Sequence, residues 1–439
     1  MFALSINMNV EDLDGIIADQ ALERSRPATA GGIIDRENLP FWKVHSANEL
    51  IKVTTGARRS GKTTFSHLLL GGRDYAFVNF DDERLAFLGR EDLNHLLERL
   101  YIHYGEFKHL LLDEVQNIHG WELFVNRLQR IGIEVFVTGS NANLLGEELA
   151  THLTGRVARM ETLPFSFREH LVFNKISADP ATTSGRARLQ RSLGDYIATG
   201  GFPEAVKRPQ SAKMYLAELF SSIIAKDVVA RYRIRYVKTL KEMAVTLVSN
   251  PASLTTFNKL KNIHSVKSVH TVKNYMDYLT GAYLLQMVDR YSPKPKEVAN
   301  SPKKVYAIDT GMVNALSVAS SENRGAIMEN MVFLDLMRRR SVDPGLEVYY
   351  WRDYQDNEVD FVLRKGKRIQ KLLQVSYATG PDDVRDRETR ALVKCADLLG
   401  CKDLVLVTWD FGDEIRKDGK KIACKPLWRW LMENPIPSE

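Results

Sequence analysis

Residues 56–63 read Gly56-Ala57-Arg58-Arg59-Ser60-Gly61-Lys62-Thr63, and this stretch decides the fold of the 439-residue chain. It fits the pattern G-x-x-x-x-G-K-[ST], follows an apolar segment at 50–53 and opens a helix-compatible one at 62–70. The two glycines let the backbone turn tightly, so that successive N–H groups point at phosphates. The sequence therefore predicts a phosphate-binding loop between a strand and a helix.

The side chains of this loop predict a nucleotide with a metal ion. Lys62 can reach the β- and γ-phosphates, and the Thr63 hydroxyl can hold Mg²⁺. A glycine-rich surface loop before a helix is the alternative, and no residue distinguishes ATP from GTP. The residues expected to bind the nucleotide are Gly56, Ala57, Arg58, Arg59, Ser60, Gly61, Lys62, Thr63 and Thr64.

Hydrolysis also requires an acid for the metal ion and a group that orients water. The apolar run at 110–112 leads into Asp113 and Glu114, about fifty residues after the loop. Asp113 at the carboxyl end of a buried strand can hold Mg²⁺ together with Thr63, and Glu114 can polarise the attacking water. An acidic turn after a strand is the alternative, but the pairing with the loop favours a hydrolytic site.

Two further positions can complete such a site. The next apolar run ends in Ser140 and Asn141, either of which can sense the γ-phosphate or, alternatively, cap the following helix. Arg156 can stabilise transition-state charge on the nucleotide of a neighbouring subunit, with Arg159 as the second choice. An ordinary surface arginine is the alternative reading for both.

The pattern of the first 175 residues predicts a parallel α/β sheet. Apolar runs at 50–53, 75–80, 110–112 and 135–138 alternate with helical patterns at 91–104 and 121–131. Such alternation favours a parallel sheet with helices on both faces and the ligand at the carboxyl ends of the strands. Asp81 and Asp82 end the second run, where they face the same crevice or cap a helix.

The remaining chain divides into further domains. A helix, a turn, a second helix and a strand before residue 292 suggest a winged helix-turn-helix, which binds DNA or serves as a lid or protein contact. Strand and helix patterns after residue 300 predict a second α/β domain. The expected domains are an N-terminal appendage (1–45), a P-loop AAA+ core (46–175), a helical lid (176–236), a winged-helix-like domain (237–292) and a C-terminal α/β domain (300–439).

The motifs together resemble a known family, the predicted prokaryotic AAA+ ATPases that carry an uncharacterised conserved C-terminal domain. The resemblance implies ATP rather than GTP, an ATP-driven switch or motor, and a homo-oligomer whose nucleotide site is completed between subunits. The motifs that carry it lie at 58–63, 110–116, 138–140, 155–156, 163–169, 200–203, 306–311, 329–330, 350–352 and 358–361.

The C-terminal domain is similar to restriction-endonuclease-like nucleases. Glu329 on a helix and Asp360 on a strand match the acids that bind Mg²⁺ there. The last strand of such a nuclease carries Glu-x-Lys, but this chain has Gln374 and Ser376, which supply neither a carboxylate nor a cation. The sequence therefore predicts a degenerate nuclease site unless Lys371 or an outside residue substitutes.

Composition narrows the functional class only moderately. The net charge of +6 is too small to indicate nucleic-acid binding by itself, and three cysteines without C-x-x-C spacing argue against disulfides and zinc. No apolar run is long enough for a membrane span, so a cytoplasmic protein without a membrane partner is expected. The leading hypothesis is an ATPase acting on double-stranded or branched DNA or on a DNA-bound protein. A slow nucleotide-gated scaffold and an ATP-regulated nuclease are the alternatives.

Overall fold

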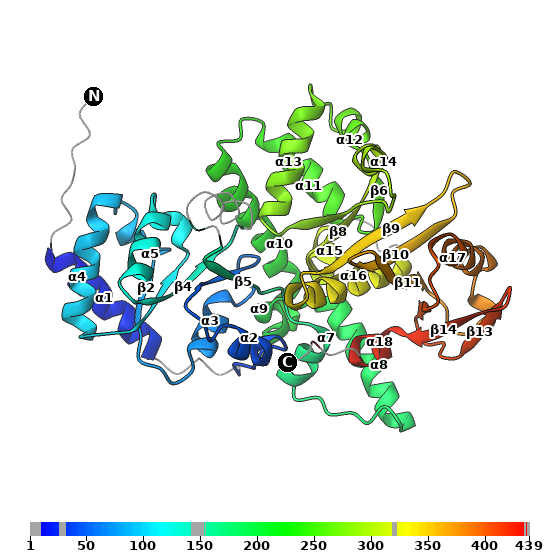
Figure 1. The fold of residues 1–439 in the computed structure, drawn as a ribbon, viewed down its shortest axis with the longest axis horizontal. Helices are drawn as coiled ribbons and strands as arrows, with labels where there is room; N and C mark the ends of the chain where they lie inside the picture. The colour runs from blue at the N-terminus through cyan, green and yellow to red at the C-terminus, as the bar shows by residue number, and fades with distance from the viewer. Residues whose placement is uncertain are drawn as a thin grey trace. The chain divides into compact units, whose positions relative to one another are not determined.

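The computed structural model describes residues 10–25, 32–141, 153, 155–317, 323–433 and 436. The chain forms two compact units, one of residues 1–162 with 438–439 and one of residues 163–437, which are described separately (Figure 1). In the described segments, none of the helices has the length and apolar character needed to cross a bilayer.

The first unit is built on a five-stranded sheet in the order β2-β3-β4-β1-β5, and its strand pairs are all parallel. The predicted parallel sheet is confirmed, and the edge strand β5 is an addition to it. Because parallel strands end at one edge of a sheet, the loops after β1, β3 and β4 meet there. The strands are β1 (Ile51–Thr55), β2 (Ala76–Asn79), β3 (His109–Asp113), β4 (Glu134–Gly139) and β5 (Val157–Glu161).

Helices cover both faces of this sheet. One face packs against α1, α4 and α5, which contribute apolar side chains such as Ile16, Leu96 and Val125 to the main core. The other face packs against α2 and α3 through Trp42 and Phe65. The helices are α1 (Val10–Ser25), α2 (Leu39–His45), α3 (Lys62–Leu70), α4 (Leu93–Tyr104) and α5 (Trp121–Arg130), with 3₁₀ turns η1 (Glu83–Leu85), η2 (Arg90–Asp92) and η3 (Val115–Asn117).

The second unit begins with helices that correspond to the predicted lid. They are α7 (Phe167–Phe173), α8 (Thr183–Thr199), α9 (Pro203–Lys207), a 3₁₀ turn η4 (Pro209–Ser211), α10 (Ala212–Ser222) and the π-helical η5 (Ile223–Ala230). A later helix, α15 (Thr310–Leu316), packs against α8 and α10. The division of the chain at residue 162 places 163–175 with these helices, whereas the sequence placed them with the ATPase core.

A tight backbone junction joins the glycine pair at 200–201 to the start of α15. The Asp309 carboxylate accepts hydrogen bonds from the N–H groups of Gly201 (2.6 Å) and Met312 (2.9 Å). A Cβ on Gly200 would lie 2.1 Å from that carboxylate, so a side chain there has no room. Burial raises the pKa of Asp309 to about 6. The motifs at 200–203 and 306–311 therefore meet at a structural contact.

A small three-stranded sheet follows, in the order β6-β8-β7, with antiparallel pairs. The strand predicted at 304–308 lies in this sheet as β8, although the sequence assigned it to the C-terminal domain. Strand pairing is a long-range contact, and the local pattern of residues does not specify the partner. The elements are α11 (Val237–Val248), β6 (Ser253–Thr255), α12 (Phe257–Ile263), α13 (Val269–Gly281), β7 (Leu285–Val288), α14 (Pro295–Asn300) and β8 (Lys303–Ala307).

The C-terminal part holds a mixed six-stranded sheet in the order β13-β14-β12-β11-β10-β9. Strands β9, β10 and β11 are antiparallel, whereas β12 is parallel to β11 and β14. The three cysteines are free and buried, and they lie in its core. The elements are α16 (Arg324–Val342), β9 (Leu346–Arg352), β10 (Glu358–Lys365), β11 (Arg368–Ser376), a 3₁₀ turn η6 (Pro381–Asp383), α17 (Asp386–Leu399), β12 (Leu404–Thr408), β13 (Glu414–Lys417), β14 (Lys420–Pro426) and α18 (Leu427–Glu433).

Candidate functional site

The glycine-rich loop connects β1 to α3 at the carboxyl edge of the parallel sheet. Gly56 and Gly61 have φ values of 153° and 95°, a region that favours glycine. A Cβ on Gly56 would lie 2.1 Å from the Thr162 carbonyl oxygen, so no side chain fits there. The backbone is thereby fixed in a tight turn around the space that precedes α3.

Lys62 is buried and turns back into the loop. Its ammonium donates to the Ala57 carbonyl at 3.2 Å and lies 3.2 Å from a carboxylate oxygen of Glu114. The loop also contains the hydroxyl of Ser60, which is buried and has no hydrogen-bond partner among the described residues. A cation and a spare hydroxyl therefore face the interior of the loop.

Thr63 and Asp113 lie together, although fifty residues separate them. The Thr63 hydroxyl is 2.9 Å from both carboxylate oxygens of Asp113, and the Thr138 hydroxyl donates to the same carboxylate. Burial raises the pKa of Asp113 to about 6, against the opposing effect of these hydroxyls. The Thr63 hydroxyl in the first turn of α3 and the Asp113 carboxylate at the end of β3 form the donor set expected for Mg²⁺.

Glu114 is held in a strained position by three neighbours. Its φ is 52°, which is unusual for a residue with a side chain, and its N–H donates to the Thr138 hydroxyl at 3.0 Å. The Gln116 amide donates to its carboxylate and is 3.4 Å from the Ser140 hydroxyl. Burial raises the pKa of Glu114, but Lys62 and Gln116 outweigh that effect, so its pKa lies below the ordinary value.

The structure brings most of the predicted site residues together. Ser140 and Asn141 are buried immediately after β4, and Ser140 lies next to Gln116. Asp82 caps η1 by accepting from the Arg84 N–H at 3.1 Å, as the capping alternative predicted. The helix expected near residue 143 lies outside the described residues.

Arg156 lies away from the loop of its own chain. Its carbonyl accepts from the Ile51 N–H at 2.8 Å, at the amino end of β1, whereas the loop follows the carboxyl end. The guanidinium is exposed and donates to the Asn126 side chain at 2.7 Å. Arg159 is exposed on β5, in register with Val53. Arg156 therefore does not contribute to the phosphate loop of the same chain.

Three residues near the site were missed by the sequence reasoning. Thr138 lies in the motif at 138–140, and Gln116 lies in the motif at 110–116. Membership of these motifs was the sequence signal that could have identified both residues. Arg36 precedes α2, is buried, and donates to the Ser60 carbonyl of the loop at 3.1 Å. No local pattern indicated that the segment before α2 would reach the loop.

A separate buried cluster lies in the second unit and contains the predicted nuclease-like acids. The Lys304 ammonium is 2.8 Å from Glu329, 2.7 Å from Glu358 and 2.8 Å from Asp360. The Tyr306 hydroxyl also donates to Glu329, at 2.6 Å. The sequence left open that a residue outside the last strand supplies the missing cation, and in the structure Lys304 of β8 lies among these acids.

The remaining residues considered for this cluster, Gln374, Ser376 and Lys371, make ordinary structural contacts. Gln374 accepts from the Asp360 N–H at 3.3 Å, and Ser376 is buried. Lys371 pairs with Asp403 at 3.2 Å and does not substitute for the missing lysine. Among the described residues, no group of three or more acidic, histidine or cysteine side chains has a geometry that could hold a metal ion.

The cluster carries more carboxylates than cations, and its titration reflects that imbalance. Burial and the neighbouring Asp360 together raise the pKa of Glu329 to about 8, against the lowering effect of Lys304 and Tyr306. Burial lowers the pKa of Lys304, but Asp360 and Glu329 outweigh this effect and hold it well above the ordinary value. The surrounding carboxylates therefore favour the charged form of Lys304.

Three family models match most of the chain. Residues 48–171 match the model of an AAA domain, residues 190–323 a Domain of unknown function (DUF8612), and residues 324–429 a Domain of unknown function (DUF4143). The AAA match includes the glycine-rich loop and both acids after β3. It supports the resemblance predicted from the motifs, without testing the nuclease-like part.

Two relatives of unassigned function are similar over most of the chain. "Uncharacterized protein MJ1544" of Methanocaldococcus jannaschii is 34% identical over 398 residues, which cover 87% of this chain and 88% of the relative. An uncharacterized protein of Haemophilus influenzae is 28% identical over 425 residues, covering 91% and 99%. Among solved structures, the Walker-type ATPase paby2304 of Pyrococcus abyssi is similar with a TM-score of 0.44 and 16% identity, over 66% of this chain and 98% of that one.

Proposed function

This chain belongs to the family of MJ1544 of Methanocaldococcus jannaschii and is a P-loop ATPase with an AAA domain, and from this premise we propose that it is a Mg²⁺-dependent, nucleotide-driven switch or motor. The observation that carries the proposal is the contact of Thr63 with Asp113 beside the pair Lys62 and Glu114. ATP and Mg²⁺ are the cofactors that this donor set fits.

Each residue of the site has a separate role in hydrolysis. When bound, ATP supplies the phosphoryl group that is transferred to water, and Mg²⁺ neutralises charge on its oxygens. Lys62 and the N–H groups of the loop bind phosphate oxygens, and Thr63 with Asp113 holds the metal. Glu114 orients a water molecule and accepts its proton. Ser140 and Asn141 follow β4 and are placed to sense the γ-phosphate.

The contact between Lys62 and Glu114 supports a switch. The same ammonium that binds phosphate also holds the catalytic carboxylate, at 3.2 Å. A ligand that engages Lys62 weakens its hold on Glu114, because one ammonium divides its charge between both. Occupation of the loop is thereby coupled to the position of the residue that activates water.

Arg156 is proposed to act between subunits. Its exposed guanidinium lies at the amino end of β1, away from the loop of its own chain. A homo-oligomer in which this surface faces the loop of a neighbour would bring a positive charge to the transferred phosphoryl group. The oligomer and this role belong to the proposal.

DNA, or a protein bound to DNA, is the proposed object of the switch. The element order α11-β6-α12-α13-β7-α14-β8 and the sheet order β6-β8-β7 support a winged helix-turn-helix, whose second helix commonly binds DNA. A cytoplasmic location is proposed with it. A scaffold that hydrolyses ATP slowly is the alternative in which the helices after residue 236 bind a protein.

Nuclease activity is a second candidate that one observation favours and another opposes. The order α16-β9-β10-β11-α17-β12, with Glu329 and Asp360 in contact with the same ammonium, supports a restriction-endonuclease-like domain. The Lys304 ammonium occupies the space between these acids, where a catalytic metal would have to bind. We therefore expect a nuclease-like fold without metal-dependent cleavage.

One experiment on the full chain tests these alternatives. ATP turnover is measured in Mg²⁺ with no DNA, duplex DNA, branched DNA and single-stranded DNA, while the DNA is examined for cleavage. Turnover that DNA stimulates, and that Glu114→Gln abolishes, supports the proposal. Near-zero turnover that DNA does not change would overturn it in favour of the scaffold. Cleavage that disappears in Asp360→Ala would establish the nuclease.

A further inference from the structure

A stretch of the second unit is rich in lysine and contains no acidic residue. Residues 256–273 include four lysines and two histidines, and no aspartate or glutamate occurs from 243 to 276. The stretch corresponds to α12, the turn after it and the first part of α13. Its local charge is therefore strongly positive, although the net charge of the chain is only +6.

The packing of the two helices leaves these lysines on the outer surface. Leu260, Val272 and Met276 are buried and anchor α12 and α13 to the core. Lys259, Lys267 and Lys273 are exposed, and Lys261 is half-buried. We call this set of four lysines the basic face.

Little in the described structure neutralises the basic face. Within the described ranges, no carboxylate lies within 4.0 Å of Lys259, Lys261 or Lys267. The fourth lysine, Lys273, lies 5.5 Å above the ring of Phe257, and Asp277 follows it one turn later. Surface lysines elsewhere in the same unit, such as Lys294 and Lys303, have acidic partners.

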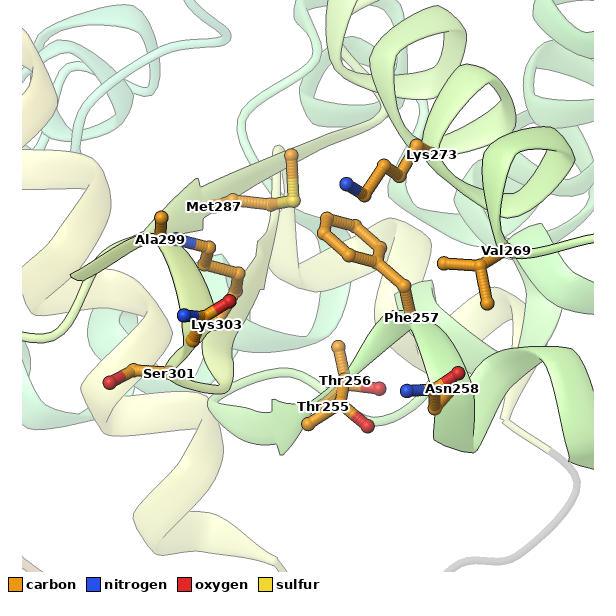
Figure 2. Close-up of a pocket in the computed structure, with 11 residues that line it drawn as sticks. Thr255, Thr256, Phe257, Asn258, Val269, Lys273, Met287, Ala299, Ser301 and Lys303 are labelled. Atoms are coloured by element: carbon orange, nitrogen blue, oxygen red, sulfur yellow. The ribbon is translucent and has the colours of Figure 1, made fainter. Parts of the chain in front are cut away.

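A small hollow of about 180 Å³ adjoins the basic face. Figure 2 shows Lys273 and Phe257 on one side of it, with Thr255, Thr256 and Asn258 below. Ser301 from the end of α14 contributes a further hydroxyl. The lining thus combines two lysines, Lys273 and Lys303, with apolar, hydroxyl and amide groups. Lysine, hydroxyl and amide groups are those that proteins use to bind phosphate and sugar oxygens.

We propose that the basic face, together with this hollow, binds the sugar-phosphate backbone of duplex DNA, with α13 directed into a groove. This inference rests on the proposed function and specifies the partner of the switch. A polyanion fits because unpaired lysines gain by releasing counterions from DNA. A duplex fits because α12 and α13 have the order of a helix-turn-helix, in which the second helix enters the major groove.

The number of lysines predicts the salt dependence. Each phosphate contact adds about −0.9 to the slope of log affinity against log salt, so four contacts give a slope of roughly −3.6. A fourfold rise in salt then weakens binding on the order of 100-fold. Replacement of the four lysines by glutamine is expected to remove most of that slope.

The test measures binding of a labelled duplex of about 20 base pairs to the full chain by fluorescence anisotropy, without nucleotide, across salt from about 50 to 200 mM. The variant is Lys259→Gln, Lys261→Gln, Lys267→Gln, Lys273→Gln. Its matched control is Lys175→Gln, Lys213→Gln, Lys367→Gln, Lys402→Gln, which removes the same charge from exposed positions elsewhere. We expect the first variant to lose on the order of 100-fold in affinity at low salt, and the control to lose less than about threefold.

Several outcomes would overturn the inference. Equal losses in the variant and the control would show a general charge effect. Preference for single-stranded DNA, or displacement of the duplex by an acidic polypeptide such as polyglutamate, would assign the face to another partner. Circular dichroism and thermal unfolding confirm that both variants fold. ATP turnover of the unaltered chain without DNA is measured separately, so that an inactive ATPase is distinguished from a face that does not bind DNA.

Discussion

Two lysines, each buried beside carboxylates, serve different purposes in the two units. Lys62 contacts one carboxylate and one backbone carbonyl, both at 3.2 Å, in a loop where the Ser60 hydroxyl has no described partner. Lys304 contacts three carboxylates at 2.7 to 2.8 Å and is completely enclosed. A buried polar group without a hydrogen-bond partner, such as the Ser60 hydroxyl near Lys62, favours the binding of a ligand. A lysine whose ammonium already contacts three carboxylates, as Lys304 does, instead stabilises the fold.

The comparison also explains why similar residues predict different chemistry. In the loop, the Lys62 ammonium has a single carboxylate partner at 3.2 Å and follows a turn of backbone N–H groups, an arrangement that suits a polyphosphate. In the C-terminal cluster, three carboxylates surround one ammonium, so Lys304 offsets part of their negative charge. The following experiments test this contrast.

The largest effect is expected at the loop. Glu114→Gln keeps the hydrogen-bonding shape but cannot accept a proton, so ATP turnover should fall by about 100-fold or more while nucleotide binding persists. Turnover is measured by phosphate release, and binding by a fluorescent nucleotide. Glu98→Gln, at an exposed position on α4, is the matched control. Equal turnover in the two variants would remove Glu114 from the mechanism.

The next effect concerns stability of the C-terminal cluster. Lys304→Met leaves the buried carboxylates unpaired and should lower the free energy of unfolding of the second unit by about 3 to 5 kcal/mol. Lys303→Met removes a neighbouring, more exposed ion pair with Asp289 and should cost about 1 kcal/mol at most. Urea unfolding measures both changes.

A double variant distinguishes the loss of charge pairing from a packing defect as the cause of the lower stability. Asp360→Asn added to Lys304→Met removes one of the unpaired charges and should recover part of the lost stability. No recovery would mean that the methionine side chain, rather than the charge, causes the loss. None of these variants is expected to cleave DNA in Mg²⁺.

A smaller effect should follow from loosening Glu114. Gln116→Leu removes the amide that holds the Glu114 carboxylate beside Ser140, and we expect kcat to fall by about tenfold with little change in KM. Gln129→Leu, which loses a bond to the Glu49 carbonyl at the other end of the sheet, is the control. A rise in KM without a change in kcat would indicate nucleotide binding instead of positioning.

The smallest effect is a pH dependence in the helix after the loop. Burial lowers the pKa of His67 to about 4, below the ordinary value of 6.5. The unfolded chain therefore binds the proton more readily, and stability is lost as pH falls from about 6.5 toward 4. At about pH 5.5 the loss should be roughly 1 kcal/mol.

The matched variant for this effect is His67→Gln. In the unaltered protein the imidazole lies 2.7 Å from the Tyr75 hydroxyl, and a glutamine amide can still form a hydrogen bond with that hydroxyl. It should flatten the pH profile of thermal unfolding over that range. An unchanged profile would assign the acid sensitivity to other groups.

Much of the first unit could be predicted from the sequence because its signals are local. The glycine-rich loop, the apolar strand before Asp113 and the alternation of strands and helices each lie within a few residues. The position of Thr138 beside Glu114 was missed, since only the sheet brings the ends of β3 and β4 together. Gln116 was also missed, although it lies only two residues after Glu114 in the chain. Arg36 was missed for the same reason, because it reaches the loop from a segment before α2.

The C-terminal cluster was harder to predict because its residues come from distant segments. Glu329 and Asp360 were found through a resemblance, but Lys304 lies in β8, which pairs with β6 and β7. A lysine in an apolar strand carries no local sign of its partners. Only the folded chain shows that one ammonium meets three carboxylates.

The sequence by itself predicted the phosphate-binding loop, since the geometry of phosphate binding is encoded in eight consecutive residues. It also determined the positive charge of residues 256–273. The tertiary structure alone decided which acids meet which cations and which lysines remain without acidic partners. Ion pairing depends on distances between segments far apart in the chain, and only packing sets those distances.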